Sequence, residues 1–116
     1  MKYILLIYSE EGVWPPDELA VARDESVGVC HKLNDQGQYL GAAPLEAANT
    51  ATCVRVRDGN LAVSDGPYAE TKEQLAGYFL IDVAGLDEAI EVASQIPGTT
   101  RGTTEIRSII ELPGMP

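Results

Sequence analysis

Two stretches of the chain are apolar at nearly every position. Lys2 to Tyr8 reads KYILLIY, and Gly77 to Val83 reads GYFLIDV. A strand with one face in water alternates between apolar and polar residues, whereas a strand covered on both faces does not. The pattern therefore predicts two strands that each bury both of their faces.

Two other segments carry apolar residues at helical spacing. The first runs from near residue 16 to near residue 36, with prolines and acids in its first turn and Gly37 where a left-handed cap is expected. The second runs from about Leu86 to Ile96 and is stopped by Pro97. The predicted apolar stripes consist of Leu19, Ala22, Ser26, Cys30 and Leu33 in the first helix, and of Leu86, Ala89, Ile90, Ala93 and Ile96 in the second.

The other predicted elements are strands. Residues 38–46 form a weak strand, and the alternating residues 52–57 pair back through the turn Asp58-Gly59 onto residues 61–64. The stretch TTEIRSIIEL forms the last strand. The order β-α-β-β-β-β-α-β is typical of an α+β fold: a ferredoxin-like split βαβ sheet with an added hairpin, in a single domain of residues 1–116.

Two helices can cover only one face of such a sheet. The other face carries apolar side chains, namely Ile4, Leu6, Tyr8, Tyr78 and Leu80. An exposed apolar surface of this size needs a partner. The sequence therefore predicts a homodimer in which two sheets pack through the face that lacks helices and enclose a shared interior.

Composition and charge exclude several function classes. A net charge of −10 opposes binding to nucleic acids and to anionic membranes. No apolar run is long enough for a membrane span or a signal peptide, so a cytoplasmic location is expected. Cys30 and Cys53 have no second Cys or His at ligand spacing, which predicts free thiols and no metal site. No phosphate loop or dinucleotide motif is present, and no cofactor is expected.

The stretch SDGPYAETKEQ concentrates polar side chains between two predicted strands. Residues 65–67 have the composition of a turn, and Asp65 is also a candidate general acid/base or ligand acceptor. Tyr68 either packs or directs its hydroxyl group at a ligand. Residues 70–74 are predicted to form one helical turn, with Lys72 paired to a nearby carboxylate or ordered against a partner subunit.

The motif VRVRDG, followed by DGPYAETKEQLAGYFLIDV, resembles the YCII-related family in its DGPF-domain branch. The resemblance extends to MKYILLIY, LDEAIEVASQIPG and EIRSI, with Tyr68 in place of the family's usual Phe. It implies a dimeric ferredoxin-like α/β barrel related to muconolactone isomerase, with a His/Asp site. DGPF-type members often accompany extracytoplasmic-function sigma factors, which implies a role near transcriptional regulation.

The single histidine and two arginines complete the set of candidates. His31 lies on the flank of the first helix's apolar stripe, so it is either an isomerase-like acid/base, a common role of histidine, or an exposed residue. Arg55 and Arg57 project from the same face of a strand. Either could hold a substrate carboxylate, or pair on the surface with one of the 18 acids.

These residues leave three function classes open. The first is an acid/base enzyme or binding protein for a small organic ligand. Its catalytic candidates are Asp65 and His31, and its ligand-binding candidates are Tyr68, Arg55, Arg57 and Lys72. The second is a non-catalytic regulatory or interaction module associated with sigma-factor-dependent transcription, and the third is a structural dimer without a ligand.

Overall fold

The computed structural model describes all 116 residues. The strands are β1 (Lys2–Ser9), β2 (Tyr39–Pro44), β3 (Thr52–Arg57), β4 (Asn60–Asp65), β5 (Gln74–Asp82) and β6 (Gly102–Ser108). The helices are α1 (Pro16–Asp35) and α2 (Leu86–Gln95), with short 3₁₀ helices η1 (Ala48–Thr50) and η2 (Pro97–Thr100).

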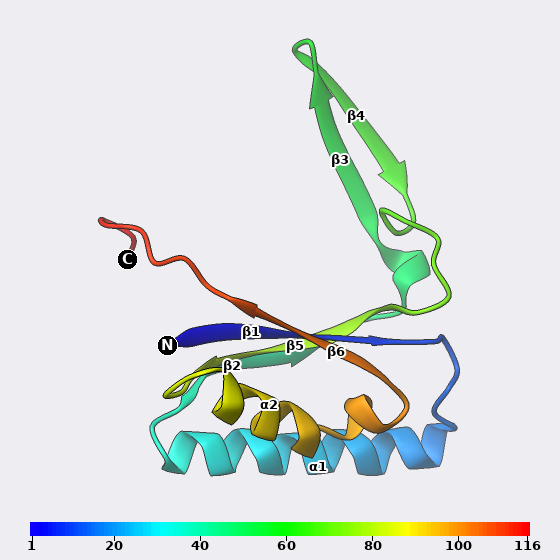
Figure 1. Cartoon of the computed structure of the whole chain (residues 1–116). Helices are drawn as coiled ribbons and strands as arrows, with labels where there is room; N and C mark the ends of the chain where they lie inside the picture. Colours follow the sequence, from blue (N-terminus) through cyan, green and yellow to red (C-terminus); the bar gives the residue numbers. More distant parts are fainter.

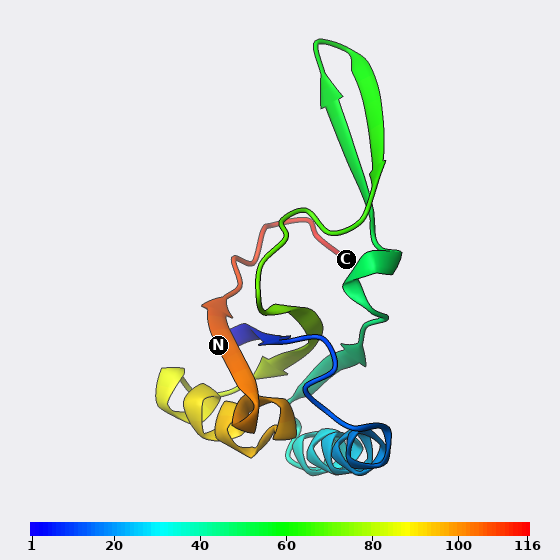
Figure 2. The same ribbon diagram turned by 90° about the vertical axis from the view of Figure 1, so that its right-hand side faces the viewer.

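Four strands form one antiparallel sheet in the order β2-β5-β1-β6. Both helices lie on the same face of this sheet (Figure 1). The element order and the strand order are compatible with the predicted ferredoxin-like framework. The predicted hairpin, β3 and β4, is a separate two-stranded sheet that stands away from the body, on the side opposite the helices (Figures 1 and 2).

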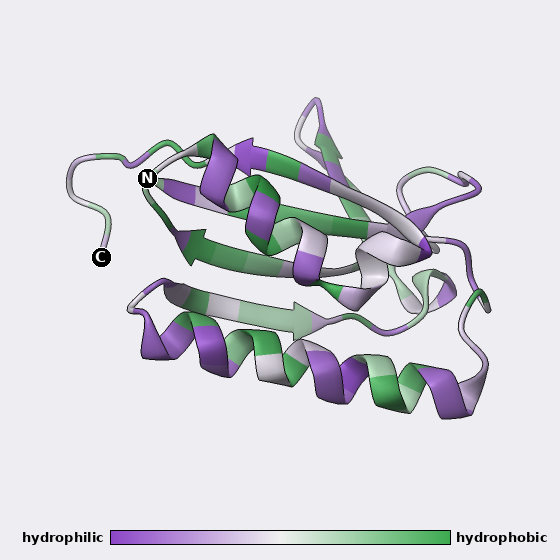
Figure 3. Ribbon diagram, turned by 60° about the horizontal axis from the view of Figure 1, so that its bottom comes forward, coloured by the Kyte–Doolittle hydropathy of each residue, from purple (hydrophilic) through white to green (hydrophobic).

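The hydrophobic core lies between the four-stranded sheet and the helices. Alternate residues of β1 and β5 supply most of it, and Leu5 and Ile81 are fully enclosed. The central strands are hydrophobic along most of their length (Figure 3). Their other side chains, such as Leu6 and Leu80, face away from the helices and are only partly buried. In the single chain, the central strands therefore bury only the face that packs against the helices, and not both faces as predicted.

Helix α1 ends as the sequence predicts. Gly37 has a φ of 72°, and the Gln38 and Gly37 N–H groups donate to the carbonyls of Leu33 and Asn34 at 2.9 and 3.1 Å. This pair of bonds is a Schellman cap, which satisfies carbonyls that the helix leaves free. Of the predicted stripe of α1, only Ala22 and Leu33 are buried.

Helix α2 is rotated relative to the predicted stripe. Its buried residues are Ala89, Val92 and Ala93, whereas Leu86 and Ile90 are exposed. Of the predicted stripe, Ala89, Ala93 and Ile96 are buried, whereas the prediction was wrong for Leu86 and Ile90. Small alanines let this side of the helix approach the sheet closely, and the larger side chains stay outside the contact.

The hairpin of β3 and β4, residues 52–65, is called the arm below. Asp58 and Gly59 have φ angles of 53° and 77° between the paired residues Arg57 and Asn60. Positive φ at both central residues of a two-residue loop is the signature of a type I′ turn, whose twist matches that of the paired strands. The predicted hairpin and its turn are confirmed.

The segment after the arm is not the predicted helical turn. The Gln74 side-chain amide donates to the carbonyls of Ala69 and Thr71 at 2.9 and 3.0 Å, and the Thr71 hydroxyl donates to the Glu73 carbonyl at 2.6 Å. Side chains that bond the local backbone compete with a helix, and here they stabilise an irregular loop instead.

Candidate functional site

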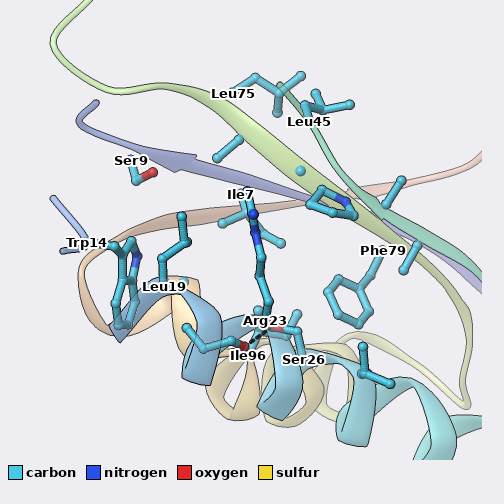
Figure 4. Close-up of a pocket in the computed structure, with 18 of the residues that line it drawn as sticks. Ile7, Ser9, Trp14, Leu19, Arg23, Ser26, Leu45, Leu75, Phe79 and Ile96 are labelled. Atoms are coloured by element: carbon cyan, nitrogen blue, oxygen red, sulfur yellow. Dashed lines mark hydrogen bonds between the residues drawn. The ribbon is translucent and has the colours of Figure 1, made fainter. Parts of the chain in front are cut away.

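A cavity of about 870 Å³ lies between α1 and the β2 side of the four-stranded sheet (Figure 4). Of the 29 residues that line it, 16 are hydrophobic. Binding sites for small molecules usually have volumes of ~300–1,000 Å³ and mostly apolar walls. The cavity therefore has the size and the surface of a small-molecule site.

Small residues on both walls create this space. Helix α1 presents Ala22 and Ser26, and the facing strands β2 and β5 present Ala42 and Gly77. A Cβ atom on Gly77 would lie 2.9 Å from the Ala43 carbonyl oxygen, so this position on the wall admits no side chain without a shift of β2. Few large side chains therefore fill the space between this part of α1 and the facing strands.

The apolar lining comes from several elements. Ile7 and Phe79 reach it from β1 and β5, Leu19 from α1, and Ile96 from the end of α2 (Figure 4). Ile7, Phe79 and Ile96 also belong to the core cluster, so this wall is continuous with the most rigid part of the protein.

Arg23 is the only arginine or lysine that lines the cavity. Its side chain extends from α1 into the space below the sheet (Figure 4). It takes part in none of the four ion pairs of the chain, although the chain has 18 acidic residues. Arg23 is exposed, so its guanidinium group contacts solvent as well as the cavity. Because it has no carboxylate partner, this group is free to bind an anion.

Three acidic residues line the cavity, namely Glu10, Glu11 and Glu46, and the first two are engaged elsewhere. Glu10 pairs with Lys72 at 3.2 Å, and Glu11 accepts a hydrogen bond from the Ala48 N–H at 2.9 Å. These contacts hold both carboxylates at the rim, where the loop after β1 meets the segments that flank the arm. None of the three carboxylates forms an ion pair with Arg23.

His31 lies on the same side of α1 as Arg23, eight residues further along, and it also lines the cavity. Eight residues span about 12 Å of helix axis. A ligand that contacted both side chains would therefore lie along α1 rather than across it. His31 is exposed, so its ring is in contact with solvent as well as with the cavity.

Cys30 and Tyr39 face each other inside the cavity. Burial raises the pKa of the Cys30 thiol above its ordinary value, and burial likewise raises the pKa of the Tyr39 phenol. Both groups are therefore neutral at physiological pH. Cys30 and Cys53 are both free thiols, as predicted. Cys30 adds a neutral, weakly polar surface to the cavity wall.

Trp14 closes one end of the cavity and is held by a charged neighbour. The Arg101 guanidinium lies 4.0 Å from the centre of the Trp14 ring and forms an ion pair with Glu18 at 2.9 Å. This contact lowers the pKa of the Glu18 carboxyl group. The start of α1 is thereby tied to the residue that precedes β6.

The structure places most of the sequence-predicted site residues outside the cavity. Asp65 is exposed at the end of β4, and Tyr68 follows with 83% of its surface exposed. Arg55 lies over the Tyr68 ring at 5.8 Å, and the Arg57 guanidinium donates to the Val56 carbonyl at 3.1 Å. Lys72 pairs with Glu10, as the sequence suggested. None of the five candidates lines the cavity, and the roles predicted for them stay predictions.

Sequence reasoning found His31 but missed Arg23 and Trp14. Arg23, Ser26 and Cys30 follow one another at helical spacing, His31 is next to Cys30, and all four line the cavity. This row contained the signal, because an arginine beside small residues on a core-facing helix surface predicts a gap rather than tight packing. Trp14 precedes the helix, and no periodic pattern includes it.

Two structural facts bear on other function classes. Neither helix combines the length and the apolar composition that crossing a membrane requires. No three side chains of His, Cys, Asp or Glu come together as a metal site.

Comparison with known proteins identifies the family. The model of the YCII-related domain matches residues 1–113. An uncharacterised protein of Rhizobium meliloti (strain 1021) is 38% identical over 115 residues, which cover 94% of this chain and 92% of the relative. The match extends over the sheet, both helices and the arm. The chain therefore belongs to the YCII-related family.

Proposed function

We propose that this protein binds a small, largely apolar organic acid in the cavity between α1 and the sheet. The observation that carries the proposal is the unpaired Arg23 in a cavity whose other lining is mainly hydrophobic. The apolar walls favour the carbon skeleton of a ligand, and the guanidinium fork favours its carboxylate.

His31 is the acid/base candidate of this site. Its imidazole ring lines the cavity, and imidazole is the commonest general acid/base in enzymes, so it is placed to exchange a proton with a bound acid. Arg23 would anchor the carboxylate, and a carbon atom some way along the ligand would lie near His31. A simple proton transfer, as in an isomerisation, needs these two groups and no cofactor.

Asp65 stays a candidate from the sequence. It lies at the root of the arm and outside the cavity of its own chain. A role in acid/base chemistry would require a second chain to bring the carboxylate to a cavity.

The protein acts as a homodimer in this proposal. The sheet face that lacks helices carries the partly buried Ile4, Leu6, Tyr78 and Leu80, which form cross-strand pairs between β1 and β5. A second copy packed on this face would bury them between two sheets. The cavity lies on the opposite, helix side of the sheet, so dimerisation leaves it accessible.

Trp14, the single tryptophan, provides the test because it lines the cavity. The purified protein is titrated with aromatic and aliphatic monocarboxylates of six to ten carbon atoms and with their amides, while Trp14 fluorescence is followed. We expect a carboxylate to bind and its amide to bind at least ~10-fold more weakly, since a charged hydrogen bond contributes roughly 1.5–3 kcal/mol.

Two variants locate the binding group. Arg23→Gln should weaken carboxylate binding at least ~10-fold and leave amide binding unchanged. Arg57→Gln, on the arm, is the matched control and should leave both affinities unchanged. Equal binding of acid and amide, or equal effects of the two variants, would overturn the assignment of Arg23. His31→Gln should spare binding and abolish any proton exchange at the ligand.

A further inference from the structure

The arm has one strongly apolar face. Pairing places Val54 opposite Val63 and Val56 opposite Leu61, so these four side chains project from the same side of the hairpin. Each is between 59% and 67% exposed. The other side carries Arg55 opposite Ala62 and Cys53 opposite Ser64. The hairpin is therefore amphipathic, and its apolar face touches nothing that buries it.

A two-stranded ribbon cannot bury such a face by itself. Isolated hairpins are at best marginally stable in water, and they become stable when a third strand or another surface covers their apolar side. Sequences usually place charged residues where strand surfaces stay in water. The four apolar residues of the arm break that rule, which indicates that a surface covers them.

The direction of the arm limits what this surface can be. The arm rises on the side of the sheet opposite the helices, which is the side with the unpartnered apolar face (Figures 1 and 2). The C-terminal segment lies on this side too, and its Ile110, Leu112 and Met115 are exposed. A molecule that covered the sheet face would therefore lie beside the arm.

The surface of the chain is large enough for a partner of its own size. The solvent-accessible area is 7985 Å², whereas a compact monomer of this mass exposes about 6,100 Å². The radius of gyration is 16.0 Å, against about 13 Å for a compact domain of this length. The excess of about 1,900 Å² exceeds the ~800 Å² that each partner of a standard interface buries. Two chains together would bury about twice this area, which falls in the ~2,000–5,000 Å² range of extensive homodimer interfaces.

We propose that the arm clasps a second copy of this chain, with the face formed by Val54, Val56, Leu61 and Val63 packed against that copy. The inference rests on the homodimer proposed above and adds a second contact region to it. A six-residue strand spans about 20 Å, and packed sheets lie about 10 Å apart. The tip of each arm would thus pass the partner's sheet and reach the level of its helices. With two-fold symmetry, the arm of each chain would pack against the other chain in the same way.

Neighbouring residues on β4 supply a matched pair of variants. Val63→Asp places a charge on the apolar face, and Ala62→Asp places the same charge one residue away on the opposite face. The dimer dissociation constant is measured by sedimentation equilibrium. We expect Val63→Asp to weaken dimerisation at least ~10-fold and Ala62→Asp to change it less than ~3-fold. Equal effects of the two variants would overturn the inference.

Hydrogen exchange of the wild-type protein checks the arm without a substitution. Arm amides should exchange slowly at concentrations where the dimer forms and much faster after dilution to monomer. Exchange of the arm that is fast and independent of concentration would refute the clasp and would leave this face free for another kind of protein.

A third variant distinguishes a failure of the arm contact from a failure of the proposed dimer. Leu6→Asp charges the centre of the free sheet face and should produce monomers. A wild-type protein that is monomeric at micromolar concentration would overturn both the dimer and the clasp. A wild-type dimer that Leu6→Asp dissociates and Val63→Asp does not would overturn the clasp alone.

Discussion

Substitution of Gly66, at the root of the arm, should lower the free energy of unfolding, whereas substitution of Gly28, inside α1, should raise it. Gly66 has a φ of 99°, a conformation that residues with a side chain rarely adopt. Its N–H donates to the Ala51 carbonyl at 2.7 Å, and its own carbonyl accepts from the Cys53 thiol at 3.3 Å. These bonds hold the backbone in place, so a new side chain cannot relax the strain freely.

The expected magnitude follows from the backbone alone. No atom lies within 4 Å of a Cβ built on Gly66, so a collision contributes nothing. Gly66→Val should therefore lower the free energy of unfolding by the cost of the strained backbone, roughly 1–3 kcal/mol. At about 3–6 °C per kcal/mol for a chain of this size, the melting temperature falls by about 3–18 °C.

Gly28→Ala is the matched control. Gly28 also has open space around its Cβ position, but its backbone is helical. Alanine should raise the free energy of unfolding by about 0.4–1 kcal/mol, because it restricts the unfolded chain and favours the helix.

Both variants are measured by calorimetry at one fixed protein concentration, since dimerisation makes melting temperatures depend on concentration. An unchanged melting temperature for Gly66→Val would show that the turn does not need its glycine, or that the arm unfolds apart from the body. A loss of stability in Gly28→Ala would contradict the reasoning about open space and backbone.

Two further predictions concern charge and protonation. Because the pKa of Cys30 is raised, the thiol stays neutral, and Cys30 should react with a disulfide reagent at pH 8 more slowly than a small-molecule thiol does. The stability that the neutral thiol contributes is complete below pH 9 and is lost as the pH rises further. To measure this, the free energies of unfolding of the wild type and of Cys30→Ala are compared in denaturant at pH 7 and pH 10. The Glu18 carboxyl group has a lowered pKa, so its pair with Arg101 stabilises the fold above about pH 4.5, and the contribution disappears as the pH falls below this value. Arg101→Gln should cause a small loss of stability at pH 7 that decreases towards pH 3, because protonation of Glu18 removes the ion pair while the contact with the Trp14 ring remains. A change in Trp14 emission at pH 7 is also expected, and a loss of equal size at both pH values would contradict the assignment.

Local chemistry made much of the fold predictable. The Schellman cap at Gly37 and the type I′ turn at Asp58-Gly59 depend on residues next to one another, and both were confirmed. The long apolar runs identified the central strands. The loop at residues 70–74 was mispredicted because the Gln74 side chain folds back onto the backbone, a tertiary detail that composition does not show.

The candidate site was less predictable, because a cavity is a property of two elements together. Ser26 and Cys30 fit an apolar stripe when α1 is considered alone, and Ala42 and Gly77 fit a strand. Only the facing of small residues on both elements leaves a space, and Arg23 borders this space from an exposed position on α1. The dense polar residues after Ser64 were predicted to border a ligand site. In the structure, several of them form hydrogen bonds and an ion pair that stabilise a loop.

The most direct test of the central claim, that the cavity beside Arg23 is the ligand site, is a map of amide chemical shifts. The protein labelled with nitrogen-15 is titrated with the carboxylate that binds best in the fluorescence assay. The proposal predicts that the largest shifts occur at Arg23, Ser26, Ala42 and Gly77, the residues on both walls of the cavity. Shifts centred on residues 65–72, with these four positions unchanged, would contradict it and would move the site to the root of the arm.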